Sequence, residues 1–122
     1  ENMDKNKKSG FDINELKNLM EKFNFGFVLD VQHAYEHDST MKYASDLLQM
    51  GKDRLKYLHV SGETENNNHA LVYQARNSKQ IISFLKEIFS VKNVPIILEG
   101  EYKNSQEIKT EIDFIKKELG FD

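Results

Sequence analysis

The chain has 122 residues, of which 39% are hydrophobic and 30% charged, a composition typical of one soluble domain and too polar for a membrane protein. Its 17 basic and 20 acidic residues give a net charge of −3, so charge alone gives no reason to expect nucleic acid. The absence of Cys excludes disulfides, thiolate nucleophiles and Cys-type zinc sites, so any metal must be held by His, carboxylate or amide ligands.

The first ten residues are polar and precede the first predicted element. Glu1 stands where an initiator Met is expected, and Glu1-Asn2-Met3 runs directly into the polar stretch 4–10. We therefore expect the chain to be part of a larger gene product. No apolar run marks secretion or membrane insertion, and a chain without Cys fits a reducing, cytoplasmic compartment.

Helical and strand-like segments alternate from residue 13 onward. Apolar side chains at three- and four-residue spacing predict helices over residues 13–23, 40–50, 79–89 and 106–119. Short apolar runs rich in β-branched and aromatic residues predict buried strands over residues 25–29, 55–58 with Val60, and 94–98. The order αβαβαβα predicts a single α/β domain without an internal boundary.

Local signals also mark the helix ends and their buried faces. Asp12 or Asn14 is expected to cap the first helix, Asn77 or Ser78 the third, and Gly120 to end the last. The apolar stripe of the first helix is predicted to lie in the core and consists of Leu16, Leu19, Met20 and Phe23.

Each apolar run is followed by a potential metal ligand, namely Asp30, His59 and Glu99. Strands joined by single helices are parallel, and right-handed crossovers place their carboxyl ends on one side, so these side chains are expected to converge. Polar residues also end strands merely because the chain reaches solvent there. Three ligand types in succession favour a site for Mn, Mg, Co or Zn.

Neighbouring residues extend this hypothesis. His33 follows Asp30 by three positions, in a predicted loop, and is expected to contact the same ion or the substrate. His37 is interpreted as an ordinary surface or hydrogen-bonded loop residue. Glu101 competes with Glu99 as the third ligand. Glu99 is favoured because it directly follows the apolar run.

Taken together, these residues resemble a known family. The matching strings are Phe27-Val28-Leu29-Asp30-x-x-His33-Ala34, Leu58-His59-Val60-Ser61-Gly62, His69, and Ile97-Leu98-Glu99-Gly100. They are similar to the second half of xylose-isomerase-like (β/α)₈ TIM barrels of the apurinic-endonuclease-2 type. The resemblance implies that residues 1–122 are the C-terminal half of such a barrel, from the end of strand five through helix eight, since a whole barrel needs about 250 residues.

The resemblance also implies a ligand set and an activity. Family members carry a Glu-Asn dipeptide at the end of strand five, so Glu1 would join Asp30, His59 and Glu99 around a divalent metal ion. In the isomerase and epimerase branch the metal polarises a sugar or sugar-phosphate carbonyl, and Glu1 and Glu99 would be the catalytic acid and base. His33 would orient the sugar.

The endonuclease branch is the second possibility and would act on DNA. Its multi-zinc site uses an Asp-x-His pair after strand seven, but here Asn67 holds the Asp position while His69 is kept. Phosphodiesterases of small nucleotide-like substrates share the pattern as well. His69, in a loop expected to span residues 61–77, and Arg76 are predicted substrate-binding residues, although Arg76 could equally pair with a carboxylate.

A non-catalytic scaffold is the third possibility, because a fold does not guarantee chemistry. A bound ion lost on substitution of Asp30 or His59 would separate an enzyme from a scaffold. A three-stranded parallel sheet also exposes two edges and one face, so we expect a homo-oligomer or a companion N-terminal half.

Overall fold

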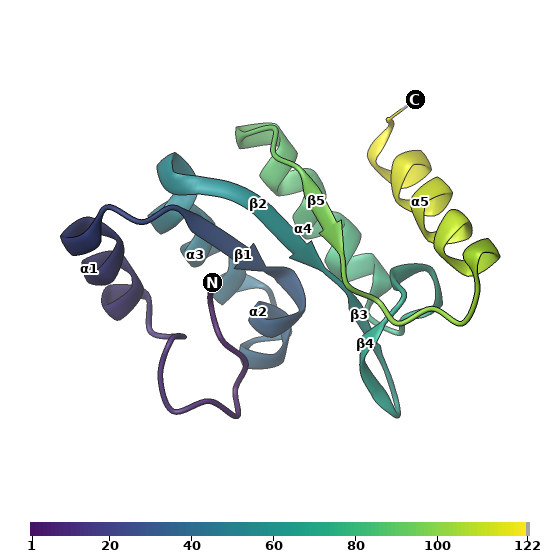
Figure 1. The fold of residues 1–122 in the computed structure, drawn as a ribbon, viewed down its shortest axis with the longest axis horizontal. Coiled ribbons are helices and arrows are strands. Elements are labelled where there is room, and N and C mark those ends of the chain that lie inside the picture. Colours follow the sequence, from purple (N-terminus) through teal and green to yellow (C-terminus); the bar gives the residue numbers. More distant parts are fainter. Residues whose placement is uncertain (122) are drawn as a thin grey trace.

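The structure, a computed structural model, describes residues 1–121 and confirms the α/β class. Strands β1 (Phe27–Asp30), β2 (Leu55–Val60) and β5 (Ile96–Leu98) form a parallel sheet in the order β1-β2-β5 (Figure 1). All three carboxyl ends therefore lie at the same edge of the sheet, as the alternation of helices and strands predicts.

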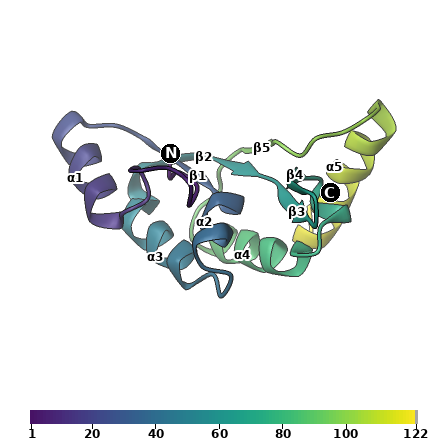
Figure 2. The same ribbon diagram turned by 90° about the horizontal axis from the view of Figure 1, so that it is seen from below.

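Five α-helices accompany the sheet: α1 (Ile13–Phe23), α2 (Val31–His37), α3 (Lys42–Gly51), α4 (Ser78–Val91) and α5 (Ser105–Leu119). Two short 3₁₀-helices, η1 (Lys52–Arg54) and η2 (Val72–Gln74), lie in connections. Figure 2 shows α2, α3 and α4 on one side of the sheet, while the opposite face carries no helix within residues 1–121. In that same part of the chain, no helix combines the length and the apolar character needed to cross a membrane.

The core lies between the sheet and the helices on its covered face. The side chains of Leu29 and Leu58 pair across β1 and β2 and are fully buried. Their partners come mainly from α3 and α4: Ala44, Leu47, Leu48, Ile81, Leu85 and Ile88. Because successive strand residues point to opposite faces, the neighbouring positions Val28, Tyr57 and Ile97 point to the uncovered face.

Several predicted helix features are confirmed. Helix α1 has the predicted bounds, and the Asp12 side chain caps it by accepting a hydrogen bond of 2.9 Å from the Glu15 backbone N–H. Gly120 ends α5 in the left-handed conformation that glycine adopts without strain. Asn77 precedes α4, but its side chain makes no cap hydrogen bond.

The predicted core stripe of α1 is half wrong. Leu16 and Met20 are buried, whereas Leu19 and Phe23 are 42% and 51% exposed. Helix α1 lies beyond the β1 edge of the sheet and packs beside α3 (Figure 1). Only one side of α1 therefore contacts other elements. Phe23 instead stacks on Phe25 at the surface, with 5.4 Å between ring centroids.

Two elements were not expected. Residues 31–37 form α2, so His33 and His37 lie on a helix instead of a loop; seven residues are too few to show helical periodicity in the sequence. The segment 61–77, expected to be a loop, contains an antiparallel hairpin, β3 (Gly62–Thr64) and β4 (Asn67–Ala70), followed by η2. Asn is a poor strand former, so backbone pairing in tertiary context decides this hairpin.

Candidate metal centre

The sheet brings the predicted strand-end residues together. Asp30 is the last residue of β1 and is the register partner of His59 in β2. Glu99 directly follows β5, and its backbone N–H donates a 2.9 Å hydrogen bond to Val60, which extends the ladder by one residue. All three side chains therefore project from adjacent strands at the carboxyl edge, on the face that the helices leave uncovered.

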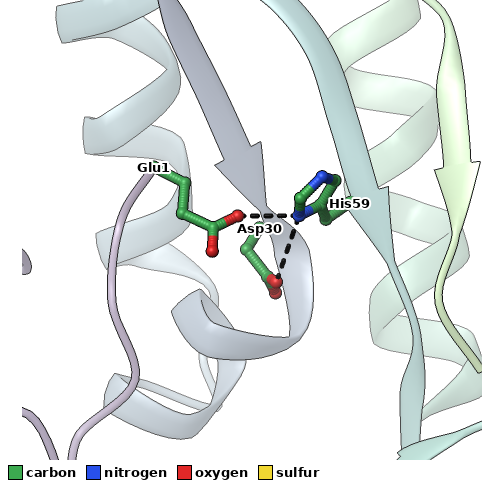
Figure 3. Close-up of side chains that lie close together, drawn as sticks. All are labelled: Glu1, Asp30 and His59. Carbon is green, nitrogen blue, oxygen red and sulfur yellow. Dashed lines mark ion pairs between the residues drawn. The ribbon is translucent and has the colours of Figure 1, made fainter.

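Three carboxylates surround one imidazole nitrogen. His59 Nδ1 lies 2.7 Å from a Glu1 oxygen, 3.2 Å from a Glu99 oxygen and 4.0 Å from an Asp30 oxygen. Figure 3 shows Glu1, Asp30 and His59 pointing toward one another from the N-terminal segment, β1 and β2. Donor atoms of these three residues all lie within 4.8 Å of one another. Glu99 lies outside this group of three, but its side chain, which is 35% exposed, approaches the same His59 nitrogen from the end of β5.

Glu1 reaches this cluster because Asn2 is fixed beside β1. The Asn2 side chain is fully buried; its amide donates a 2.9 Å hydrogen bond to the Asp30 carbonyl and its oxygen accepts one of 2.8 Å from the Asp30 N–H. The amide thus pairs with Asp30 as a neighbouring strand would. In the sequence, Asn2 stands out only as part of the Glu-Asn dipeptide of the resemblance. No sequence pattern indicates that its side chain pairs with the backbone of Asp30.

His33 lies beside the cluster with a defined tautomer. Its Nδ1 lies 3.0 Å from the Asn2 carbonyl oxygen and 3.5 Å from an Asp30 carboxylate oxygen. A hydrogen bond to a carbonyl requires a proton on Nδ1, so Nε2 of the neutral ring is left as an acceptor. The Asp30 carboxylate also accepts a 2.9 Å hydrogen bond from the His33 backbone N–H, which caps α2.

Burial and like charge make the ionised form of Asp30 costly. Desolvation, helped by the negative charges of Glu1 and Glu99, raises the pKa of Asp30 to about 6. The hydrogen bond from the His33 backbone N–H, and the positive charge of the His33 ring when it is protonated, act in the opposite direction. A site that gathers several carboxylates around a buried one lacks positive charge. A cation bound among these oxygens would supply it.

The raised pKa of Asp30 predicts a pH-dependent stability. Its folded pKa of about 6 exceeds the ordinary 3.8, so its stabilising contribution is complete below pH 3.8 and is lost as the pH rises through 6, by roughly 3 kcal/mol. Asp30→Asn keeps the cap acceptor and cannot ionise. In chelator-treated protein, urea unfolding should give near-equal stabilities at pH 4 and a more stable variant at pH 7.5. A difference that does not change with pH would contradict the assignment.

The donor set fits a divalent ion of the borderline to hard class. Carboxylate oxygens and one imidazole nitrogen are the ligands that Mn²⁺, Co²⁺, Zn²⁺ and Mg²⁺ accept in proteins. Ligands at about 2.0 to 2.2 Å from an ion lie about 3 to 4 Å from one another, close to the spacing of the Glu1, Asp30 and His59 donors. The residue types and their spacing would therefore suit a divalent ion.

The structure does not bring the remaining predicted residues into this cluster. The Arg76 guanidinium pairs with Glu63, through contacts of 2.9 and 2.6 Å to one carboxylate oxygen, which is the alternative role considered for it. His69 lies exposed on β4. Its backbone N–H donates to the Asn67 side chain, and its carbonyl accepts from the Glu101 N–H.

A buried polar network behind the site was missed in the sequence. The Asn77 amide donates to Gln32 at 2.9 Å, Gln32 donates to Glu63 at 3.1 Å, and the Glu63 N–H donates back to Asn77 at 2.9 Å. These three side chains are nearly or fully buried. They tie α2, β3 and the start of α4 together and so hold the ends of β1 and β2 in place. Their positions far apart in the chain gave no sequence signal.

Comparison of the chain with family models, curated proteins and solved structures finds no match.

Proposed function

We propose that this chain is the C-terminal half of a xylose-isomerase-like (β/α)₈ barrel that binds one divalent metal ion and acts on a small sugar or sugar phosphate as an isomerase or epimerase. The observation that carries the proposal is the arrangement at the carboxyl edge of the sheet, where Glu1, Asp30 and Glu99 surround His59 Nδ1. Active sites of such barrels lie at this edge.

The uncovered face of the sheet supports the half-barrel proposal. In a barrel, helices cover the outer face of each strand and the inner face is packed within the barrel. Here the site residues and Ile97 share the face without helices, and Ile97 is 44% exposed although it is an apolar residue of a strand. A companion N-terminal half, or a second copy of the chain, would cover this face and pair with the free edges of β1 and β5.

The side chains present suit proton transfer next to a carbonyl. A divalent ion held by Glu1, Asp30, His59 and Glu99 would supply Lewis-acid polarisation of that carbonyl. The Glu1 and Glu99 carboxylates both lie beside His59 Nδ1. One, ionised, would accept the proton from the carbon beside the carbonyl, and the other, in its protonated form, would return a proton to carbon in the product. The free Nε2 of His33 accepts a hydrogen bond from a sugar hydroxyl.

The hydrolase alternative finds less support. A multi-zinc site requires further ligands from the segment after β2, but the donors lying within 4.8 Å of one another in residues 1–121 do not include His69. The Asn67 side chain, at the position of the family's carboxylate, instead donates to Glu101 at 3.3 Å and accepts from the His69 N–H at 2.8 Å. The Asn67 side chain therefore stabilises the β3–β4 hairpin and its contact with the segment after β5.

Deuterium exchange tests the proposed reaction. With Mn²⁺ or Co²⁺ in D₂O, the protein should incorporate deuterium at the carbon beside the carbonyl of a ketose or ketose phosphate, as measured by NMR over a panel of sugars. Glu99→Gln, which keeps the shape of the side chain, should lower this rate by about 10² to 10⁴. Nicking of abasic DNA without sugar exchange would favour the hydrolase, and a wild-type protein with neither metal nor activity would contradict both.

A further inference from the structure

The N-terminal segment that carries Glu1 is held by few contacts. Asn2 is its one fully buried residue, and the Glu1 side chain is 25% exposed. The Met3 N–H donates a 2.7 Å hydrogen bond to the Gly10 carbonyl, and the Gly10 N–H donates to the Glu15 carboxylate at 2.8 Å, so residues 3–10 form a closed loop. The position of Glu1 therefore depends on the pairing of Asn2 with Asp30 and on how this loop is fastened to the rest of the chain.

Two histidines of α2 bind successive carbonyls of this segment. His33 Nδ1 lies 3.0 Å from the Asn2 oxygen, and His37 Nε2 lies 3.0 Å from the Met3 oxygen. Residues four apart lie on one face of a helix, so the two imidazoles reach the segment side by side. Each ring donates an N–H hydrogen bond to a carbonyl oxygen, from Nδ1 in His33 and from Nε2 in His37, which fixes a different tautomer in each neutral ring.

The His37 ring packs against two aromatic side chains. Its centroid lies 5.0 Å from that of Phe11 and 5.1 Å from that of Tyr43. The Tyr43 hydroxyl donates a hydrogen bond to the Phe11 carbonyl, so both neighbours of the imidazole are joined to each other. These packing contacts restrict the rotation of the ring, so the Nε2–H keeps its direction toward Met3.

We propose that His37 is a positioning residue for the metal centre: through the Met3 carbonyl it holds the N-terminal segment so that the Glu1 carboxylate meets His59. His37 contacts none of the proposed ligands and acts through the backbone of residues 1–3. The metal-binding consequence of this role rests on the proposed function, but the Glu1–His59 contact of 2.7 Å exists without any metal and is testable by itself.

Substitutions at position 37 test the role in metal-free protein. His37→Phe keeps an aromatic ring and lacks the donor, whereas His37→Gln retains an N–H near the position of Nε2. Side-chain ¹⁵N NMR of His59 reports its hydrogen bond to Glu1, with Glu1→Ala, which removes the acceptor, as the reference for its loss. We expect His37→Phe to move the His59 signals toward that reference and to raise the exchange rate of the Met3 amide about tenfold or more, and His37→Gln to restore both.

Metal affinity provides the second readout. The dissociation constant for Mn²⁺ should rise about 10- to 100-fold in His37→Phe, as for other residues that orient ligands, and return to within about threefold in His37→Gln. Ile88→Val, a core change in α4 away from this segment, should lower stability and leave the constant unchanged. Wild-type His59 signals and Met3 protection in His37→Phe would overturn the positioning role. A wild-type protein that binds no Mn²⁺ would overturn only the proposed function, because the NMR result still decides the role of His37.

Discussion

If the proposed metal centre exists, replacing His59 by alanine is expected to abolish binding of the divalent ion, with affinity lowered by more than about 100-fold, beyond the usual effect of changing a residue that merely orients a ligand. His59 Nδ1 is the atom that the Glu1, Glu99 and Asp30 carboxylates all face. Alanine would remove the imidazole nitrogen that lies within 4.0 Å of an oxygen of each of these three carboxylates. Plasma mass spectrometry after dialysis against Mn²⁺, Co²⁺ or Zn²⁺ should find about one ion per wild-type chain and none in His59→Ala, and calorimetric titration should give the affinities.

Tyr57→Phe is the matched control for this experiment. Tyr57 precedes His59 by two residues on β2, points to the same uncovered face and has its ring centroid 5.5 Å from that of the imidazole. It offers no carboxylate or imidazole ligand, so its variant should retain the ion. An equal metal content in wild type and His59→Ala would contradict the proposed centre, provided that circular dichroism shows both proteins to be folded.

The second large effect is expected at Glu111, a fully buried carboxylate of α5. It accepts hydrogen bonds of 2.5 and 3.0 Å from the backbone N–H groups of Val72 and Tyr73 at the start of η2. Burial raises the pKa of Glu111, and these two N–H donors partly oppose that rise. Glu111→Ala leaves both donors without their acceptor in a desolvated site, so the free energy of unfolding should fall by roughly 3 kcal/mol, as measured by urea denaturation.

Two variants bracket this prediction. Asp113→Ala, on the same helix, removes an exposed carboxylate paired with Lys109, so it should change the free energy of unfolding by less than about 0.5 kcal/mol. Glu111→Gln keeps one acceptor but turns its NH₂ group toward the second donor, and its loss should be intermediate. If Glu111→Ala were no more destabilising than Asp113→Ala, Glu111 would not anchor η2 to α5.

Local patterns predicted most of the secondary structure for a physical reason. Helix α1 could be predicted because burial of one face of a helix imposes a periodicity on the sequence. Strands β1, β2 and β5 could be predicted because buried strands appear as short apolar runs. Helix α2 and the β3–β4 hairpin were not predicted, because they are too short or too polar to carry such a pattern.

The sequence by itself determined the α/β alternation and the placement of Asp30, His59 and Glu99 at strand ends, because both follow from where apolar runs stop. Only the tertiary structure decided which groups meet there. It placed Glu1 against His59 through Asn2, paired Arg76 with Glu63, and gave His37 and Glu111 partners more than thirty residues away. Such pairings depend on how the helices pack against the sheet. This packing decides which backbone N–H and C=O groups are buried and require a hydrogen-bond partner, and a local sequence pattern does not show it.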